Sequence, residues 1–237
     1  AVIEVPMLAE RDFVLDVDAL LDACEENTRL VFVCSPNNPT GTPLPRAELV
    51  RLLDGRAEQS VIVVDEAYIE FGNEPSVVDV LGRFPNIVVL RTLSKALGFA
   101  GARCGAVIGS SEVVRMLNAV QAPYALATPV VECVEDALVD EELRKAENMV
   151  ADVVRERERV MQRVARYPFI DKVWPSDANF FLARSSRAAA VLSRCAEQKV
   201  LLRGFSGDLA DCLRITIGSR SDNERLFAAL DAFAGEL

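Results

Sequence analysis

The chain has 237 residues and an apolar fraction of 51%, which is enough for a globular protein with a substantial core. Its formal net charge of -10 argues against a nucleic acid or an anionic membrane surface as partner, because either would need a strong basic patch. The complete lack of histidine excludes Ser-His-Asp and Cys-His catalysis and most zinc sites, so we expect no bound metal.

Targeting signals are not evident. No apolar run approaches the ~18 residues of a membrane-spanning helix. The first residues lack the basic start of a secretory signal, so we predict a soluble, cytoplasmic protein. The six cysteines show no CxxC pairing and several lie in apolar segments, which favours buried, reduced thiols.

In the first half of the chain, strand-like apolar runs alternate with helix-like segments. We expect strands at residues 30–34, 61–64, 87–90 and 104–108. We expect helices at residues 46–58, 76–82 and 111–121. This alternation predicts an α/β fold with a mostly parallel sheet flanked by helices. Several runs are apolar at successive positions, as in strands that are buried on both faces.

The second half starts with helical spacing from residue 129 to about 164, which predicts one long or kinked helix. Beyond it we expect short strands at residues 172–174, 179–183, 200–203 and 213–217, with helices at 187–198 and 222–234. Ser221, with Glu224 three residues later, predicts the N-cap and capping box of the last helix.

Lys95 lies in RTLSKALG, among hydroxyls and glycines just past an apolar run. Lysine is the side chain that forms a Schiff base with an aldehyde cofactor, and the nearby hydroxyls and Arg103 suit a phosphate group. Thr92 and Ser94 can point to one side of an extended segment. This combination indicates pyridoxal phosphate; a surface lysine after a strand is the alternative.

Two further motifs, SPNNPTG at residues 35–41 and VVDEAY at residues 63–68, each follow an apolar run and so start where a strand ends. Asp65 follows four apolar residues, which favours a buried, paired carboxylate over a helix cap or turn acid. A carboxylate about 4 Å from a cation contributes roughly 4 kcal/mol at an effective dielectric near 20, enough to keep a pyridine ring protonated.

Together, SPNNPTG, VVDEAYIEF and RTLSKALGFAGARCG resemble the class I/II aminotransferases of the fold-type I pyridoxal-phosphate superfamily, and among them the histidinol-phosphate aminotransferases. The resemblance runs from about residue 30 to about 230. It implies a large cofactor-binding domain at residues 1–128, a long interdomain helix at 129–166 and a small α+β domain at 167–237. It also implies a homodimer that moves an amino group between histidinol phosphate and 2-oxoglutarate in histidine biosynthesis.

The resemblance implies catalytic roles for several side chains. Lys95 would form the Schiff base and then move a proton between the substrate carbon and the cofactor. Asp65 would pair with the pyridine nitrogen. Tyr68 and Asn38 would donate to the ring oxygen, and Asn38 would also face the substrate.

The anionic groups would be held by other residues. By resemblance, Thr92, Ser94 and Arg103 bind the cofactor phosphate. Arg214 would bind the anionic group of the substrate, and Arg203 would share that duty. Alternation along residues 213–217 places Arg214 opposite the apolar face, where both arginines could also simply face solvent.

The resemblance begins in the middle of the family's sequence. The family's N-terminal portion, with a glycine-containing phosphate loop, an aromatic that stacks on the ring and a tyrosine from the partner subunit, has no counterpart here. We therefore expect exposed apolar surface or an unpaired sheet edge. A catalytically incomplete fragment, an aromatic aminotransferase and a phosphothreonine decarboxylase remain alternatives.

Overall fold

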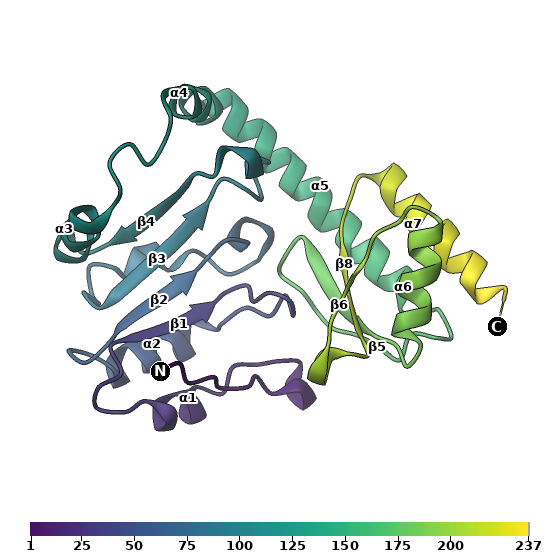
Figure 1. Ribbon diagram of the computed structural model, residues 1–237, viewed down its shortest axis with the longest axis horizontal. Coiled ribbons are helices and arrows are strands. Elements are labelled where there is room, and N and C mark those ends of the chain that lie inside the picture. The colour runs from purple at the N-terminus through teal and green to yellow at the C-terminus, as the bar shows by residue number, and fades with distance from the viewer. Residues whose placement is uncertain (237) are drawn as a thin grey trace.

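The computed structural model describes residues 1–236, which form two four-stranded sheets connected by a long helix (Figure 1). The first sheet has the order β1-β2-β3-β4. Its strands are β1 (Leu30–Cys34), β2 (Val61–Asp65), β3 (Ile87–Thr92) and β4 (Gly105–Gly109). Strands β1, β2 and β3 are parallel, and β4 is antiparallel to β3. The mostly parallel sheet is therefore confirmed.

Three helices accompany this sheet: α1 (Val17–Ala23), α2 (Arg46–Gly55) and α3 (Ser111–Val120). Helix α2 buries its apolar face against the sheet, because its leucines recur at helical spacing. The helix expected at residues 76–82 is wrong, since only a 3₁₀ turn, Val77–Val80, forms there. Three β-branched valines and Gly82 give this short segment little intrinsic helix propensity.

Burial on both faces holds only for the centre of the first sheet. The side chains of Ile62, Val64 and Ile87 in β2 and β3 are inaccessible to solvent. At the edge strand β1, by contrast, Phe32 is 68% exposed, and Val107 in β4 is 47% exposed. The expectation of strands buried on both faces is thus wrong for β1 and β4, and the expected exposed apolar surface is confirmed.

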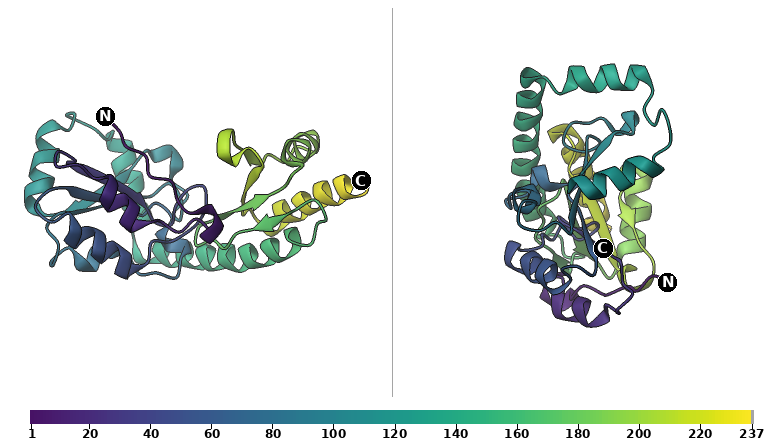
Figure 2. Two further views of the ribbon diagram at one scale, coloured as in Figure 1. Left: turned by 90° about the horizontal axis from the view of Figure 1, so that it is seen from below. Right: turned by 90° about the vertical axis from the view of Figure 1, so that its left-hand side faces the viewer.

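The single helix expected at residues 129–166 is wrong, because the segment contains two helices, α4 (Thr128–Ala137) and α5 (Asp140–Val164). Val139 between them is extended, with ψ of 151°. Three acidic residues in the first turn of α5 stabilise the new helix N-terminus. The left view of Figure 2 shows α5 as the long element that reaches from the first sheet to the second. No helix among residues 1–236 is long and apolar enough to cross a bilayer.

The second sheet is antiparallel, with the order β5-β6-β8-β7. Its strands are β5 (Lys172–Val173), β6 (Phe180–Arg184), β7 (Arg203–Gly204) and β8 (Cys212–Thr216). Helices α6 (Ala188–Glu197) and α7 (Arg220–Ala234) pack with α5 on one face, around Phe181, Leu213, Ile215 and Phe227. The α+β character of this part is confirmed, while its exact boundary as a domain stays a prediction.

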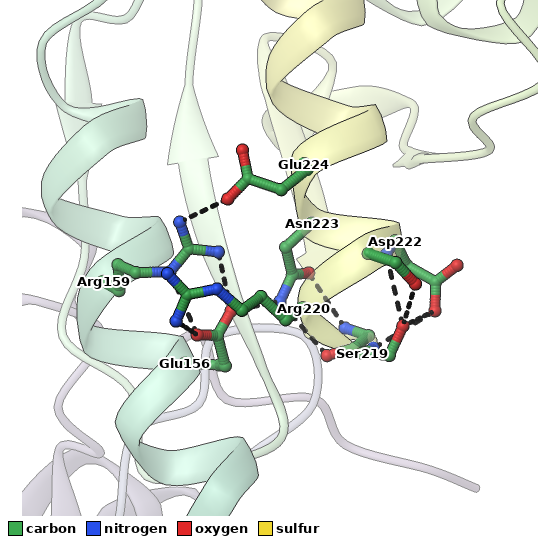
Figure 3. Close-up of polar contacts among 9 residues, drawn as sticks. Glu156, Arg159, Ser219, Arg220, Asp222, Asn223 and Glu224 are labelled. Atoms are coloured by element: carbon green, nitrogen blue, oxygen red, sulfur yellow. Dashed lines mark hydrogen bonds and ion pairs between the residues drawn. The ribbon is translucent and has the colours of Figure 1, made fainter.

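Helix α7 starts earlier than expected (Figure 3). Its N-cap is Ser219, and the capping box joins Ser219 to Asp222, so the box expected for Ser221 and Glu224 is wrong. Glu224 instead pairs with Arg159 of α5 at 2.8 Å. The side chain of Asn223, which is 1% exposed, donates to Glu156 of α5 at 3.0 Å. The start of α7 is thereby tied to α5.

Glu156 makes this tie dependent on pH. Hydrogen bonds from Arg159 and then Asn223 hold its pKa below the ordinary value of 4.5. Stability from a depressed pKa is present above the unfolded-state pKa and is lost as the pH falls through the folded-state pKa. We expect Glu156→Gln to remove part of the loss of unfolding free energy below about pH 4.5 that urea titrations measure in the unaltered chain.

Glu147 is a suitable control, since it is an exposed carboxylate of the same helix. Glu147→Gln should leave the acid dependence unchanged. An identical acid dependence in Glu156→Gln and the unaltered chain would contradict the assignment.

Candidate functional site

The three predicted motifs meet at one edge of the first sheet. Asp65 is the last residue of β2 and Thr92 the last of β3, and the loop that contains Asn38 follows β1. The register aligns Cys34 with Asp65 on neighbouring strands, so these ends lie at the same edge. Ligands of open parallel α/β sheets bind at this carboxyl edge.

Lys95 and Tyr68 are brought together at this edge. The Lys95 Nζ lies 5.4 Å from the centroid of the Tyr68 ring. Lys95 is exposed, whereas Tyr68 is only 8% exposed. Tyr68 follows Asp65 by three residues, in the turn after β2, so the three residues lie at the same edge of the sheet. The roles of these side chains stay predictions.

Asp65 caps its own turn, since its Oδ1 accepts a hydrogen bond from the Ala67 backbone N–H at 2.9 Å. The turn-acid alternative is therefore correct for one oxygen. The expected burial is wrong, because Asp65 is only half-buried at the end of β2, while its pairing with a ring cation stays a prediction. Burial, with a further contribution from the Asp65 charge, raises the pKa of the neighbouring Cys34 thiol to about 11. Cys34 accordingly stays a neutral thiol at neutral pH.

The other cysteines agree in part with the expectation. All six are free thiols, and burial raises the pKa of Cys195 and of Cys212 to about 11. Cys133 is exposed, so the expected burial is wrong for it. Among residues 1–236 no group of three potential ligands is placed to hold a metal ion.

The second sheet contributes to the site through Phe180 and Arg214. The rings of Tyr68 and Phe180 meet edge to face, with centroids 5.0 Å apart. The Arg214 guanidinium lies 4.9 Å from the Phe180 centroid, and its Nη1 donates to Asn38 Oδ1 at 2.7 Å. Phe180 was missed from the sequence, since an aromatic at the start of an apolar strand looks like any core residue.

The expected phosphate ligands are partly assembled. Thr92 Oγ1 and Ser94 Oγ are 2.9 Å apart, which confirms that the two hydroxyls share one side. Gly98 adopts φ of +73°, the left-handed conformation that glycine allows in a tight backbone path. The guanidinium of Arg103 is exposed and donates to the Ala100 carbonyl at 2.9 Å, so its part in binding a phosphate stays a prediction.

Arg203 and Arg214 are directly opposite each other in the antiparallel β7–β8 pair. Residues opposite each other in such a pair project from the same face. Neighbouring Leu213 and Ile215 point into the core, which confirms that Arg214 lies on the other face. Two like charges in this arrangement repel each other unless an anion lies between them.

An ionic network behind the site was also missed. Glu66, which is 1% exposed, accepts hydrogen bonds from Ser76 Oγ at 2.6 Å and from Val77 N–H at 2.7 Å. Arg91 of β3 lies 3.5 Å from Glu66 and 2.6 Å from Glu70. The network fastens the turn that follows Asp65 to the strand that leads to Lys95. Its only signal in the sequence is the position of Glu66 and Arg91 beside motif residues.

A cavity elsewhere is not part of this arrangement. It has a volume of about 740 Å³ and lies between residues 1–5 and β1, lined mainly by apolar side chains such as Ile3 and Phe32. Lys95, Asp65 and Tyr68 do not line it. The candidate site is therefore the polar edge of the sheet.

This geometry defines an α/β protein whose site lies at the carboxyl edge of a mostly parallel sheet, closed from the side by a second, antiparallel sheet. The family model for aminotransferase class I and II matches residues 1–230. The chain belongs to this family.

Curated relatives include histidinol-phosphate aminotransferases. The protein from Pectobacterium atrosepticum is 40% identical over 229 residues, which are 96% of this chain and 64% of the relative. That from Sodalis glossinidius is 42% identical over 226 residues, or 94% and 62% of the two chains. This chain thus spans less than two thirds of these relatives.

Solved structures agree on the fold. Histidinol-phosphate aminotransferase from Sinorhizobium meliloti, in complex with pyridoxal-5'-phosphate, is 25% identical and has a TM-score of 0.87. The match covers 99% of this chain and 64% of that structure. An aspartate aminotransferase variant from Thermus thermophilus is also 25% identical, has a TM-score of 0.84 and is covered to 68%, against 100% of this chain. The fold-type I architecture expected from the sequence is confirmed.

Gly41 ends the motif that contains Asn38 and tests how tightly this loop is held. It adopts φ of +78°, and a Cβ there would lie 2.0 Å from Ser176 Oγ. Gly207 has a similar φ of +63° but open space around it. We expect Gly207→Ala to cost about 1 kcal/mol of unfolding free energy from backbone strain alone.

Gly41→Ala should cost at least about 2 kcal/mol more, because Ser176 must also move. Urea unfolding of both variants measures the difference. Equal losses of unfolding free energy in the two variants would show that the Gly41 loop and Ser176 can move apart at little cost.

Proposed function

We propose that this chain provides the cofactor site of a pyridoxal-phosphate-dependent aminotransferase that acts on histidinol phosphate. The observation that supports the proposal most directly is the amine of Lys95 beside Tyr68, three residues after Asp65, at the carboxyl edge of the sheet. The names and the 40% and 42% identities of the curated relatives support the same reaction.

The residues present fit this cofactor. The amine of Lys95 suits an aldehyde, the Asp65 Oδ2, which makes no hydrogen bond within residues 1–236, suits a ring cation, and the paired hydroxyls of Thr92 and Ser94 suit a phosphate. When bound, pyridoxal phosphate supplies an electron sink for the carbon that loses its proton.

The chain's own residues would carry out the remaining tasks. Lys95 Nζ would hold the cofactor and then move a proton at the reacting carbon of the substrate. Asp65 would keep the ring nitrogen protonated, and Tyr68 and Asn38 would orient the ring through hydrogen bonds. Phe180 buries one side of Tyr68 and thereby limits the orientations that this ring can adopt.

The pair of arginines supports an anionic substrate. An anion between Arg203 and Arg214 would remove the repulsion that their register otherwise imposes. Because guanidinium groups bind phosphate and carboxylate oxygens in pairs, this position suits histidinol phosphate in one half-reaction and 2-oxoglutarate in the other. We include in the proposal a cytoplasmic homodimer that works in histidine biosynthesis.

The decisive experiment on the reaction adds single amino compounds to the protein loaded with cofactor. Amino transfer from histidinol phosphate, followed by its return to 2-oxoglutarate, would support the proposal. Transfer from aromatic amino acids alone, release of carbon dioxide from phosphothreonine, or no reaction at all would support the three alternatives instead.

Lys95→Ala tests the attachment of the cofactor. We expect borohydride reduction of the chain with pyridoxal phosphate to add one cofactor mass to the peptide that contains Lys95, and Lys95→Ala to lose this label and any transamination. Mass spectrometry of the digested protein shows which peptide carries the added cofactor mass. Lys145→Ala, at an exposed position of α5, should label as the unaltered chain does. Label elsewhere in the unaltered chain would refute the role of Lys95.

Arg203→Gln tests the substrate anion. The loss of a charged hydrogen bond costs about 1.5 to 3 kcal/mol, so binding of histidinol phosphate should weaken about tenfold or more. Histidinol without its phosphate should bind the variant and the unaltered chain alike. Isothermal titration provides both affinities, with Arg166→Gln at an exposed site as the control. Equal weakening for both ligands would contradict a role in binding the anion.

A further inference from the structure

Arg157 of α5 is a buried cation outside the proposed chemistry. The residue is 2% exposed, and its Nη1 donates to the carbonyl of Phe71 at 3.0 Å and to the carbonyl of Ala178 at 2.8 Å. Phe71 ends the turn that contains Tyr68, and Ala178 precedes Phe180 by two residues. One side chain of the connecting helix thus binds the backbone of both sheets' site segments.

The charge of Arg157 is poorly compensated. The Glu158 carboxylate lies 3.6 Å from its Nε but is itself 59% exposed, and Nε has no hydrogen-bond partner among the described residues. A buried ion that could be replaced by an apolar side chain of similar size is generally no source of stability. What an apolar side chain cannot do at this position is hold two carbonyls at a fixed separation.

The segment that Arg157 holds, residues 176–178, lies between two loops of the site. The Asp177 backbone N–H donates to the Gly41 carbonyl at 2.8 Å, next to the loop of Asn38. On the other side, a Cβ at Gly72 would lie 3.3 Å from the Asp177 side chain, next to the turn of Tyr68. We call residues 176–178 the wedge.

The wedge is internally rigid. The Ser176 hydroxyl donates to the Phe180 carbonyl and accepts from the Ala178 N–H at 3.1 Å. The carbonyl of Ala178 then faces Arg157, and its methyl group lies in the cluster formed by Tyr68, Phe71 and Phe180. A shift of the wedge would therefore move Phe180 against Tyr68.

We propose that Arg157 is a positioning residue that locks the wedge between the two loops and so fixes Asn38, Tyr68 and Arg214 relative to one another. The positioning of the wedge by Arg157 does not depend on the function of the chain. The expected effect of Arg157 on cofactor affinity rests on the proposed function, because the alignment of Tyr68 and Asn38 affects only a ring that is bound between them.

Hydrogen exchange of the full chain without cofactor tests the lock. In Arg157→Met we expect amides of residues 69–72 and 176–180 to exchange at least tenfold faster, while α2 and α6 exchange as before. Arg157→Lys retains a donor for one carbonyl at a time and should show intermediate rates. Arg155→Met, at a 71% exposed position of the same helix, should match the unaltered chain.

Unchanged rates in Arg157→Met, or a uniform increase over all segments, would overturn the proposal, since the second result describes general destabilisation only. If Arg157→Met does not fold, Arg157→Lys replaces it in the test. Unchanged exchange rates or a uniform increase in Arg157→Lys would then overturn the proposal.

A second measurement links the lock to the cofactor. Affinity for pyridoxal phosphate, followed by absorbance, should fall at least fivefold in Arg157→Met, with partial rescue by Arg157→Lys, although Lys95 and Asp65 are intact. Unchanged affinity in a variant with faster local exchange would overturn the link to the cofactor. Failure of the unaltered chain to bind the cofactor at all would refute the proposed function and leave the exchange result to decide on the lock.

Discussion

The edge-to-face contact of Tyr68 with Phe180 is the constraint on which the arrangement of the site depends, because it packs the turn after β2 directly against β6 of the second sheet. Tyr68 belongs to the turn after β2 and Phe180 to the first position of β6. Around them, α5 supplies Val150 and Val153 from outside. An aromatic pair of this kind contributes about 0.5 to 1.5 kcal/mol beyond its buried area. Its greater effect is geometric, since it fixes how Arg214 reaches Asn38.

The packing of the Tyr68 turn against the second sheet also explains why polar groups are buried near this turn. A turn at the end of a strand exposes backbone carbonyls and N–H groups that need partners once they are covered. The Glu66 carboxylate accepts from the Val77 N–H beside the first sheet, and the Arg157 guanidinium satisfies one carbonyl on each side, Phe71 and Ala178. Arg157 therefore holds the end of the turn of Tyr68, and Glu66 connects the start of that turn to Val77.

The sequence predicted the parts of the fold that depend on local patterns. Apolar runs gave β1 to β3 with small errors at their ends, and alternation placed Arg214 on the correct face of β8. The break at Val139 was not predicted, because α4 and α5 share the same helical spacing. The cap of α7 was misplaced by two residues, since Ser219 and Ser221 both precede an acidic residue by three positions.

Only those residues of the candidate site that lie in recognisable sequence motifs could be predicted. Asp65 stands out because it directly follows an apolar run, and Lys95 because it lies among hydroxyls and glycines shortly after one. Phe180 and Arg157 do not stand out, because their importance comes from contacts over long separations in the chain, 86 residues in the case of Arg157 and Phe71. Such contacts follow from the packing of α5 on both sheets, which no local pattern encodes.

The charge of the chain bears on how an anionic substrate would be bound. With a net charge of -10, the long-range field repels anions, so it offers no steering toward the site. At physiological ionic strength that field is screened beyond about 8 Å, whereas two guanidinium groups opposite each other in β7 and β8 act at contact distance. Binding would then depend on the local pair and on the hydrogen bond that Arg214 already makes to Asn38. That bond holds the guanidinium in place before an anion arrives, which lowers the entropy lost on binding.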